Sequence, residues 1–343
     1  MKKRTWLFLR SAHVGDRERR GPVPSSDLLA NDDMWTHLFA KAVEQSLDVF
    51  GMILRVGAPY SVVYNDRLVE MRVPDLGVLE IVPDLILNRG GYKEYLPLLK
   101  RFQNVPSVYI GCGRRWNPTD MYWSSWMKDI RVDCVLVDSP AQQKELLYEN
   151  TFRVEVFPKP ALDHIFRPVV VKKDFDIVFI SHRPDDFKGG PWLASYLPDG
   201  CRILCVGVEN ERLREEASSG RLYVEATGKV PRRDVPAQAC RGYVGVVCDD
   251  GLCDSGPRVL PEFLAMNLPV IVRSCVRADL GRYISLQSGR VVRDGKIWLT
   301  HAIQDLMINY DKLAPRAFYK KGLTLKHAAA RMVGLFEELM NGL

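Results

Sequence analysis

The amino-acid sequence predicts an α/β protein built from two Rossmann-like, doubly wound domains that face each other across a cleft. First, a chain of 343 residues exceeds the usual size of one hydrophobic core, which favours two domains of about 150 to 200 residues. Second, short apolar runs rich in β-branched residues alternate with helical stretches, as in parallel sheets. Third, this alternation restarts after a proline-rich segment, VFPKPALDHIFRPVVVKK at 156–173, which is typical of a linker.

The first half is expected to form a mostly parallel sheet with intervening helices. RTWLFLR at 4–10 predicts the first strand, and apolar spacing over 34–55 predicts a helix. Further helices are expected at 92–102 (YKEYLPLLKRF) and 140–150 (PAQQKELLYEN). The remaining strand candidates of this half are 60–66, 83–89, 106–112, 133–139 and 153–159.

The second half repeats the pattern and ends in a helix. The tail at 323–343 has the composition and apolar spacing of a helix. We therefore predict domains at 1–160 and 161–322, followed by the helix 323–343. The strand candidates of the second domain are 174–182, 201–208, 222–228, 242–249 and 269–274.

Composition and charge limit the classes of function. The 48 basic residues exceed the 42 acidic ones by a formal charge of +6, which suits phosphate-bearing ligands or contact with an anionic membrane surface. This surplus alone does not indicate a specific nucleic-acid partner. The eight cysteines form no Cys-x-x-Cys pair, which favours reduced thiols and a cytoplasmic location. No run of about 18 apolar residues predicts a membrane-spanning helix, so any membrane contact is expected to be peripheral.

Two cations follow the first strand of the second domain. Arg183 and Lys188 lie in the loop RPDDFKGG, at the carboxyl end of a strand where open parallel sheets bind ligands. Together they could clamp a diphosphate, Arg183 through a bidentate fork and Lys188 as a point charge. Alternatively, both cations pair with Asp185 and Asp186 in a solvated turn.

The stretch CDSGPRVLPEFLAMNLPVIV at 253–272 combines an irregular backbone with an apolar helical run. A proline inside a helix costs about 3 kcal/mol, so the helix should begin at about Arg258 or later, with Pro261 in its first turn. Ser255, Gly256 and Pro257 then form a tight turn at a helix N-terminus, where free N–H groups favour an anion.

Two acids flank that turn. Asp254 and Glu262 have seven residues between them and can border one pocket from opposite sides. Because carboxylates repel phosphate, their expected partners are hydroxyl groups, a ribose for Glu262 and a sugar for Asp254. In the alternative interpretation, Asp254 or Ser255 caps the helix and Glu262 is a first-turn acid that complements the helix dipole.

These residues resemble a known family. DSGPRVLPEFLAMNLPVIV is similar to the signature of retaining GT-B glycosyltransferases of the GT4-like group (glycosyl transferases group 1), in which an acid, seven residues and a glutamate precede a helix and an apolar strand. Asp254 stands where many members have Glu. RPDDFKGG, the segment at 228–250 with its Gly-x-Val-Pro loop, and KPALDHIFRPV at 159–169 also resemble family motifs, in the family's order.

The resemblance implies a function: transfer of a sugar from a nucleotide diphosphate sugar to an acceptor, with retention of anomeric configuration. Arg183 and Lys188 would stabilise the leaving diphosphate, Glu262 would orient the ribose, and Asp254 the donor sugar. The final helix would cross back onto the first domain. Because no Asp-x-Asp motif follows a strand, we expect neither a metal nor a cofactor. The other donor-binding residues implied are Gly228, Val230, Pro231, Ser255, Gly256, Pro257, Arg258 and Val259.

The first domain resembles the family less. Gly111, Cys112 and Gly113 stand where members often have a histidine near the reacting sugar. The cleft residues expected from this domain are His13, Gly15 and Arg114.

The acceptor stays open between a glycan, a lipid, a protein and a small molecule. Aromatic residues at 116–126 suit a membrane-surface or sugar acceptor, but equally a core. The alternatives in function are a nucleotide-sugar-binding GT-B protein without turnover, a nucleotide-sugar epimerase and an inverting transferase.

Overall fold

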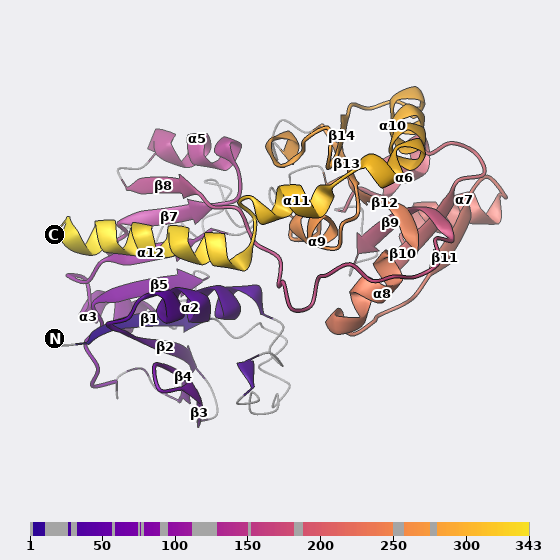
Figure 1. Ribbon diagram of the computed structural model, residues 1–343. Helices are drawn as coiled ribbons and strands as arrows, with labels where there is room; N and C mark the ends of the chain where they lie inside the picture. Colours follow the sequence, from indigo (N-terminus) through magenta and orange to yellow (C-terminus); the bar gives the residue numbers. More distant parts are fainter. Residues whose placement is uncertain are drawn as a thin grey trace. The chain divides into compact units, whose positions relative to one another are not determined.

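The protein divides into two compact units, each with its own sheet (Figure 1). Unit 1 consists of Met1–Asp138, Gln142–Phe157 and Leu325–Leu343, and unit 2 of Ser139–Ala141 and Pro158–Thr324. Both sheets are parallel or mostly parallel, which confirms the predicted α/β fold class with two doubly wound domains. The computed structural model describes residues 3–10, 27–28, 33–56, 59–74, 76, 79–89, 95–111, 129–149, 152–181, 188–249, 257–274 and 280–342.

Unit 1 contains an eight-stranded sheet in the order β3-β4-β2-β1-β5-β6-β7-β8. Its strand pairs are parallel except for β3 and β4, which pair antiparallel. The strands are β1 (Arg4–Arg10), β2 (Val49–Val56), β3 (Tyr60–Asn65), β4 (Leu68–Val73), β5 (Leu85–Arg89), β6 (Ser107–Ile110), β7 (Cys134–Val137) and β8 (Arg153–Val156).

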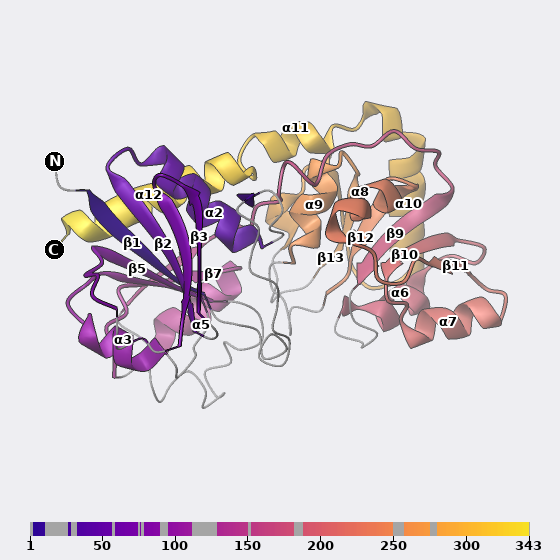
Figure 2. The same ribbon diagram turned by 90° about the horizontal axis from the view of Figure 1, so that it is seen from below.

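Helices cover both faces of this sheet. Figure 2 shows α2 and α12 on one side of the strands and α3 and α5 on the other. The rings of Trp6 on β1 and Phe336 on α12 meet edge to face with centroids 4.9 Å apart, and both are buried. The helices are α2 (Met34–Gln45), α3 (Leu96–Arg101), α5 (Pro140–Glu149) and α12 (Leu325–Asn341).

The predicted helix over 34–55 is wrong in its second half. Helix α2 ends at Gln45, and Val49–Val56 forms the central strand β2. Leu47, 87% exposed, lies in the turn between them. Because a central strand is buried on both faces, its continuous apolar run also satisfies helical spacing, so periodicity alone could not separate the two elements.

Unit 2 contains a parallel six-stranded sheet in the order β11-β10-β9-β12-β13-β14. Its strands are β9 (Phe175–Ser181), β10 (Arg202–Gly207), β11 (Tyr223–Ala226), β12 (Gly242–Val247), β13 (Val270–Arg273) and β14 (Gly289–Val292). Its α-helices are α6 (Gly190–Tyr196), α7 (Glu211–Ser218), α8 (Val235–Ala239), α9 (Val259–Ala265), α10 (Lys296–Ile308) and α11 (Pro315–Lys320). Over the described ranges, no helix has the length and apolarity needed to cross a membrane.

Both sheets contain a point where the strand order reverses. In unit 1 the chain continues from β1 to one side through β2 and later returns to the other side as β5. In unit 2 the same reversal separates β9 from β12. Open parallel sheets bind ligands beyond the carboxyl ends of the strands at such reversals. We therefore expect the functional polar side chains at the carboxyl ends of the strands next to these two reversals.

Candidate functional site

The predicted site residues fall into two groups. Lys188 and Glu262 lie in the described part of unit 2, together with Gly228, Val230, Pro231, Pro257, Arg258 and Val259. The other predicted site residues lie outside the described residues; they are His13, Gly15, Arg114, Arg183, Asp254, Ser255 and Gly256.

Lys188 lies at the strand reversal of unit 2. Its Nζ is 3.0 Å from Oδ2 of Asp249, with side chains 17% and 2% exposed respectively. Lys188 follows β9 and Asp249 follows β12, so this ion pair bridges the two strands between which the order reverses. Asp249 thereby holds a partly exposed cation at the edge of the sheet where an anionic ligand is expected.

The loop after Lys188 is held against the loop after β12. Gly189 has φ +79°, and a Cβ built there would lie 2.1 Å from the carbonyl oxygen of Cys248. The Cys248 thiol donates to the carbonyls of Lys188 and Gly189, both at 3.3 Å. A Cβ on Gly190 would lie 2.4 Å from Cγ of Asn210. The two glycines are therefore required for the close approach that positions Lys188.

Replacing Gly189 with Ala is expected to lower the free energy of unfolding by about 3 kcal/mol. The new methyl group adds a clash with a backbone carbonyl to the cost of a positive φ. Gly220→Ala is the matched control, because Gly220 has φ +76° but no atom within 4 Å of its Cβ position, and should cost about 1 to 2 kcal/mol. Equal losses for both variants in urea unfolding would contradict the packing described for Gly189.

Helix α9 carries Glu262 and begins where the prolines require. Its first residue is Val259, with Arg258 at the N-cap, so Pro261 is the third helical residue. This confirms the predicted start. The first four N–H groups of a helix have no partner within it, so Pro261 removes no helical hydrogen bond.

The carboxyl end of α9 closes in a Schellman motif. Asn267 adopts φ 62°, its N–H donates to Leu264, and the N–H of Leu268 donates to Phe263 at 3.0 Å. The Phe263 ring packs against Gly245 of β12, where a Cβ would lie 2.6 Å from the ring. The Schellman motif fixes the end of the short helix, and the packing of Phe263 fixes the helix on the sheet. Together they determine the position of Glu262.

Glu262 is buried beside an arginine. The Glu262 side chain is 8% exposed, and its Oε1 accepts a hydrogen bond from Nη2 of Arg232 at 2.6 Å. Burial raises the pKa of Glu262, and the charges of Arg232 and Arg258 oppose that rise. Both arginines therefore favour the ionised form of the carboxylate.

Residues from three of the four motif-like segments meet around Arg232. Arg232 directly follows Pro231 of the Gly-x-Val-Pro loop, and its guanidinium lies 5.3 Å from the ring centroid of Phe166. Phe166 is fully buried and comes from the segment 159–169. Glu262 comes from the third segment. The fold therefore assembles Phe166, Arg232 and Glu262 into one cluster within unit 2.

The other predicted site residues that the structure describes lie in the loop after β11 and just before α9. Gly228 has φ +66° and an open Cβ position, which suits a turn after β11. Val230 is partly exposed, and Pro257 is buried ahead of α9. Pro231 and Arg258 are exposed.

Three residues of this arrangement were not predicted from the sequence as site residues: Asp249, Arg232 and Phe166. Asp249 is the last residue of a predicted strand and Arg232 follows the predicted loop, so both positions carried a signal. Their partners, however, are 61 and 30 residues away in the chain. Only the strand order brings them together.

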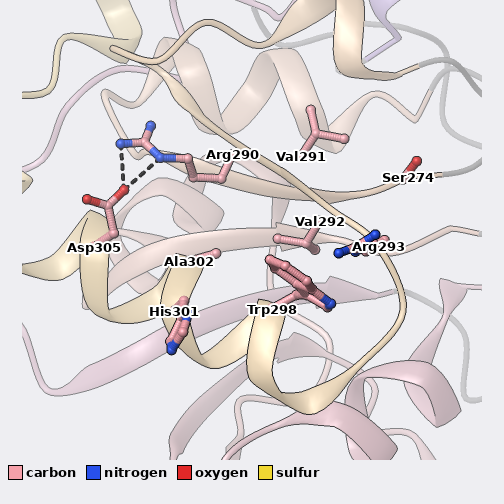
Figure 3. Close-up of a pocket in the computed structure, with 9 residues that line it drawn as sticks. All are labelled: Ser274, Arg290, Val291, Val292, Arg293, Trp298, His301, Ala302 and Asp305. Atoms are coloured by element: carbon pink, nitrogen blue, oxygen red, sulfur yellow. Dashed lines mark hydrogen bonds and ion pairs between the residues drawn. The ribbon is translucent and has the colours of Figure 1, made fainter.

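A hollow of about 490 Å³ in unit 2 contains none of the predicted residues (Figure 3). In it Arg290 pairs with Asp305 at 2.6 Å, and the guanidinium of Arg293 lies 3.9 Å from the ring centroid of Trp298. We therefore do not assign the donor site to this hollow. Its lining residues are Ser274, Arg290, Val291, Val292, Arg293, Trp298, His301, Ala302 and Asp305.

The sequence matches no protein-family model and no curated protein. Solved structures, in contrast, resemble it over its whole length. A sucrose-phosphate synthase from Thermosynechococcus elongatus superposes with a TM-score of 0.70 at 16% identity, covering 99% of this chain and 100% of that one. A glycosyltransferase from Rickettsia africae gives 0.64 at 12% identity, with 100% of both chains covered. HepE from Anabaena, in complex with UDP and glucose, gives 0.63 at 12% identity, covering 98% and 100%. The chain therefore shares the two-domain α/β fold of GT-B glycosyltransferases.

Proposed function

We propose that the protein is a glycosyltransferase that moves a sugar, such as a hexose, from a nucleotide diphosphate sugar to an acceptor, with retention of anomeric configuration. The observation that carries the proposal is the arrangement in unit 2: a buried Glu262 held by Arg232, and Lys188 held by Asp249 at the strand reversal. HepE, crystallised with UDP and glucose, supports a nucleotide sugar as donor. The resemblance to the GT4-like group supports retention.

Lys188 would act on the leaving group. When the bond between the anomeric carbon and the diphosphate oxygen breaks, negative charge grows on that oxygen. An ammonium group held in place by Asp249 stabilises this charge without having to reorganise. Lysine carries its positive charge on a compact ammonium group with three N–H donors, which suits binding to phosphate oxygens. Arg183 completes the clamp in this proposal, which includes no metal and no cofactor.

Glu262 would bind the ribose of the donor. An ionised carboxylate offers both of its oxygens as acceptors to hydroxyl groups, whereas protonation turns one of them into a donor. Arg232 engages Oε1, which leaves Oε2 for the ligand. The loop from Gly228 to Pro231 would contact the base, and Asp254 the donor sugar, with Ser255, Gly256, Pro257, Arg258 and Val259 close to the diphosphate.

Replacing Arg232 with Gln is expected to move the acid limb of donor binding to higher pH. The Arg232 charge lowers the pKa of Glu262 against the effect of burial, so its loss raises that pKa further. Donor binding then weakens at a higher pH as the solution is acidified. The measurement is calorimetric titration of the nucleotide sugar between pH 5 and 8. Arg233→Gln is the control, because this neighbouring side chain is 83% exposed and should not alter the profile; identical profiles for both variants would contradict the role of Arg232.

A thermal-shift screen of uridine, guanosine and adenosine diphosphate sugars tests the proposed function. A bound donor stabilises the folded protein according to its affinity. The selected donor is then mixed with an acceptor panel, and release of the nucleoside diphosphate is followed. Failure of every nucleotide sugar to stabilise the protein would contradict the proposal. Binding without release for any acceptor would favour a nucleotide-sugar-binding protein.

A further inference from the structure

Strand β14 forms one edge of the unit 2 sheet, and part of its backbone faces away from the sheet. The N–H of Ser274 donates to the carbonyl of Val292 at 2.6 Å, and the N–H of Val270 donates to that of Ser288 at 3.0 Å. Successive residues of a strand direct their backbone groups to opposite sides, so Ser288 and Val292 face β13 and Val291 faces outward. Among the described residues, the N–H and C=O of Val291 have no hydrogen-bond partner.

The edge strand β8 of unit 1 shows how outward backbone groups are covered elsewhere in the protein. There the side-chain N–H of Gln143 on α5 donates to the carbonyl of Val154 at 2.6 Å. The β14 edge has no such cover within the described part of unit 2, and Val291 is 48% exposed. An uncovered edge strand is a template for pairing with another extended chain.

The hollow of about 490 Å³ lies along this edge, between β14 and α10 (Figure 3). Val292 points toward α10, and together with Ala302 it gives the hollow an apolar floor, whereas Val291 points away. Domains that bind peptides by strand addition use an exposed edge for the backbone and adjoining pockets for alternate side chains. The hollow beside β14 offers both features.

Arg293 gives one end of the hollow a cation that no acid balances. Its guanidinium lies 3.9 Å from the ring centroid of Trp298, which is 44% exposed and holds the guanidinium in place. Over the described ranges, Arg293 makes no ion pair, whereas Arg290 at the other end pairs with Asp305 at 2.6 Å. A carboxylate is the charge complement of a guanidinium. The Arg293 end of the hollow therefore suits an acidic side chain.

We propose that β14 and α10 form a docking site for an extended acidic peptide segment of a partner protein, which adds to the sheet as a strand. The peptide backbone pairs with Val291. Because paired residues of neighbouring strands point to the same face, the peptide residue opposite Val292 enters the hollow, where an apolar side chain fits the floor. An acidic residue next to it reaches Arg293. This site uses no residue assigned to the donor, so it goes beyond the proposed function and does not depend on it.

A fluorescein-labelled peptide of alternating threonine and valine that ends in two aspartates is the probe. Fluorescence anisotropy with the full-length protein should show saturable binding with a Kd of about 0.1 mM, as expected for a short segment. A matched peptide that ends in two lysines should bind about tenfold more weakly. Val291→Pro removes the outward N–H but no hydrogen bond of the sheet, and should also weaken binding about tenfold. Val291→Thr keeps the N–H and should bind like the wild type.

Arg293→Gln tests the acidic end of the peptide. It should weaken binding of the aspartate peptide about fivefold and reduce the difference between the two peptides. Arg233→Gln is the control, because this side chain is 83% exposed and follows β11, at the opposite edge of the sheet, and its replacement should change neither Kd. Arg293 is exposed, so its variant remains informative even where Val291→Pro is unstable. No saturable binding, equal Kd values for the two peptides, or equal binding by Val291→Pro and Val291→Thr would overturn the proposal.

Discussion

Lys188→Gln is expected to lower nucleotide release from the donor by about 10²- to 10³-fold, the usual loss when a preorganised donor at a developing oxyanion is removed. The glutamine amide can still donate to Asp249, which is 3.0 Å from the lysine ammonium, so the buried carboxylate keeps a partner. The positive charge, however, is gone. Because that charge matters most when the diphosphate leaves, we expect a larger effect on kcat than on KM.

Lys173→Gln is the matched control for this variant. Lys173 precedes β9, and its Nζ donates to the carbonyl of Gly242 at 2.7 Å, at the amino end of β12. It therefore lies at the opposite edge of the same sheet. Steady-state assays should show Lys173→Gln close to the wild type. Similar losses in both lysine variants would show a general effect on unit 2, and an unchanged rate in Lys188→Gln would remove Lys188 from the site.

Glu262→Gln is expected to weaken donor binding by about 30-fold, which corresponds to about 2 kcal/mol for a lost charge-assisted hydrogen bond. The variant keeps the size of the side chain and one carbonyl oxygen for Arg232. It also removes the cost of burying a charge, which is what raises the pKa of Glu262. The fold should therefore be retained while the ribose loses its ionised acceptor. Calorimetric titration of the nucleotide sugar gives the Kd directly.

Glu225→Gln provides the comparison for the glutamate. Glu225 on β11 also pairs with an arginine, Arg241, at 2.9 Å, but its side chain is 39% exposed. Its replacement should leave the Kd unchanged within about twofold, because an exposed ion pair contributes little. A Kd for Glu262→Gln equal to that of the wild type would exclude Glu262 from the donor site.

Patterns within one segment of the sequence were sufficient to predict structural features that depend on that segment alone. Pro261 predicted the start of α9 at Val259 because the cost of a proline in a helix depends only on its position. Apolar runs likewise predicted most of the strands. The run from Phe50 to Val56 was misread because a fully buried strand and a buried helix share the same composition. The strands β4 and β14 were missed because charged residues interrupt their short apolar runs.

Pairings between elements could not be predicted in the same way. The ion pair of Arg232 with Glu262 joins a loop after β11 to α9, and nothing in either segment specifies the other. The ion pair of Lys188 with Asp249 is a second case, because only the neighbouring positions of β9 and β12 in the sheet bring the two loops together.

One measurement tests the central claim most directly: proton NMR of the protein with the nucleotide sugar selected by thermal shift and an acceptor that it uses. The spectrum follows the donor anomeric proton, the free nucleoside diphosphate and the product anomeric proton together. The account predicts that nucleotide and product appear at equal rates, that the product keeps the anomeric configuration of the donor, and that Lys188→Gln slows both signals alike. An unchanged donor signal, or equal rates in the wild type and Lys188→Gln, would contradict it.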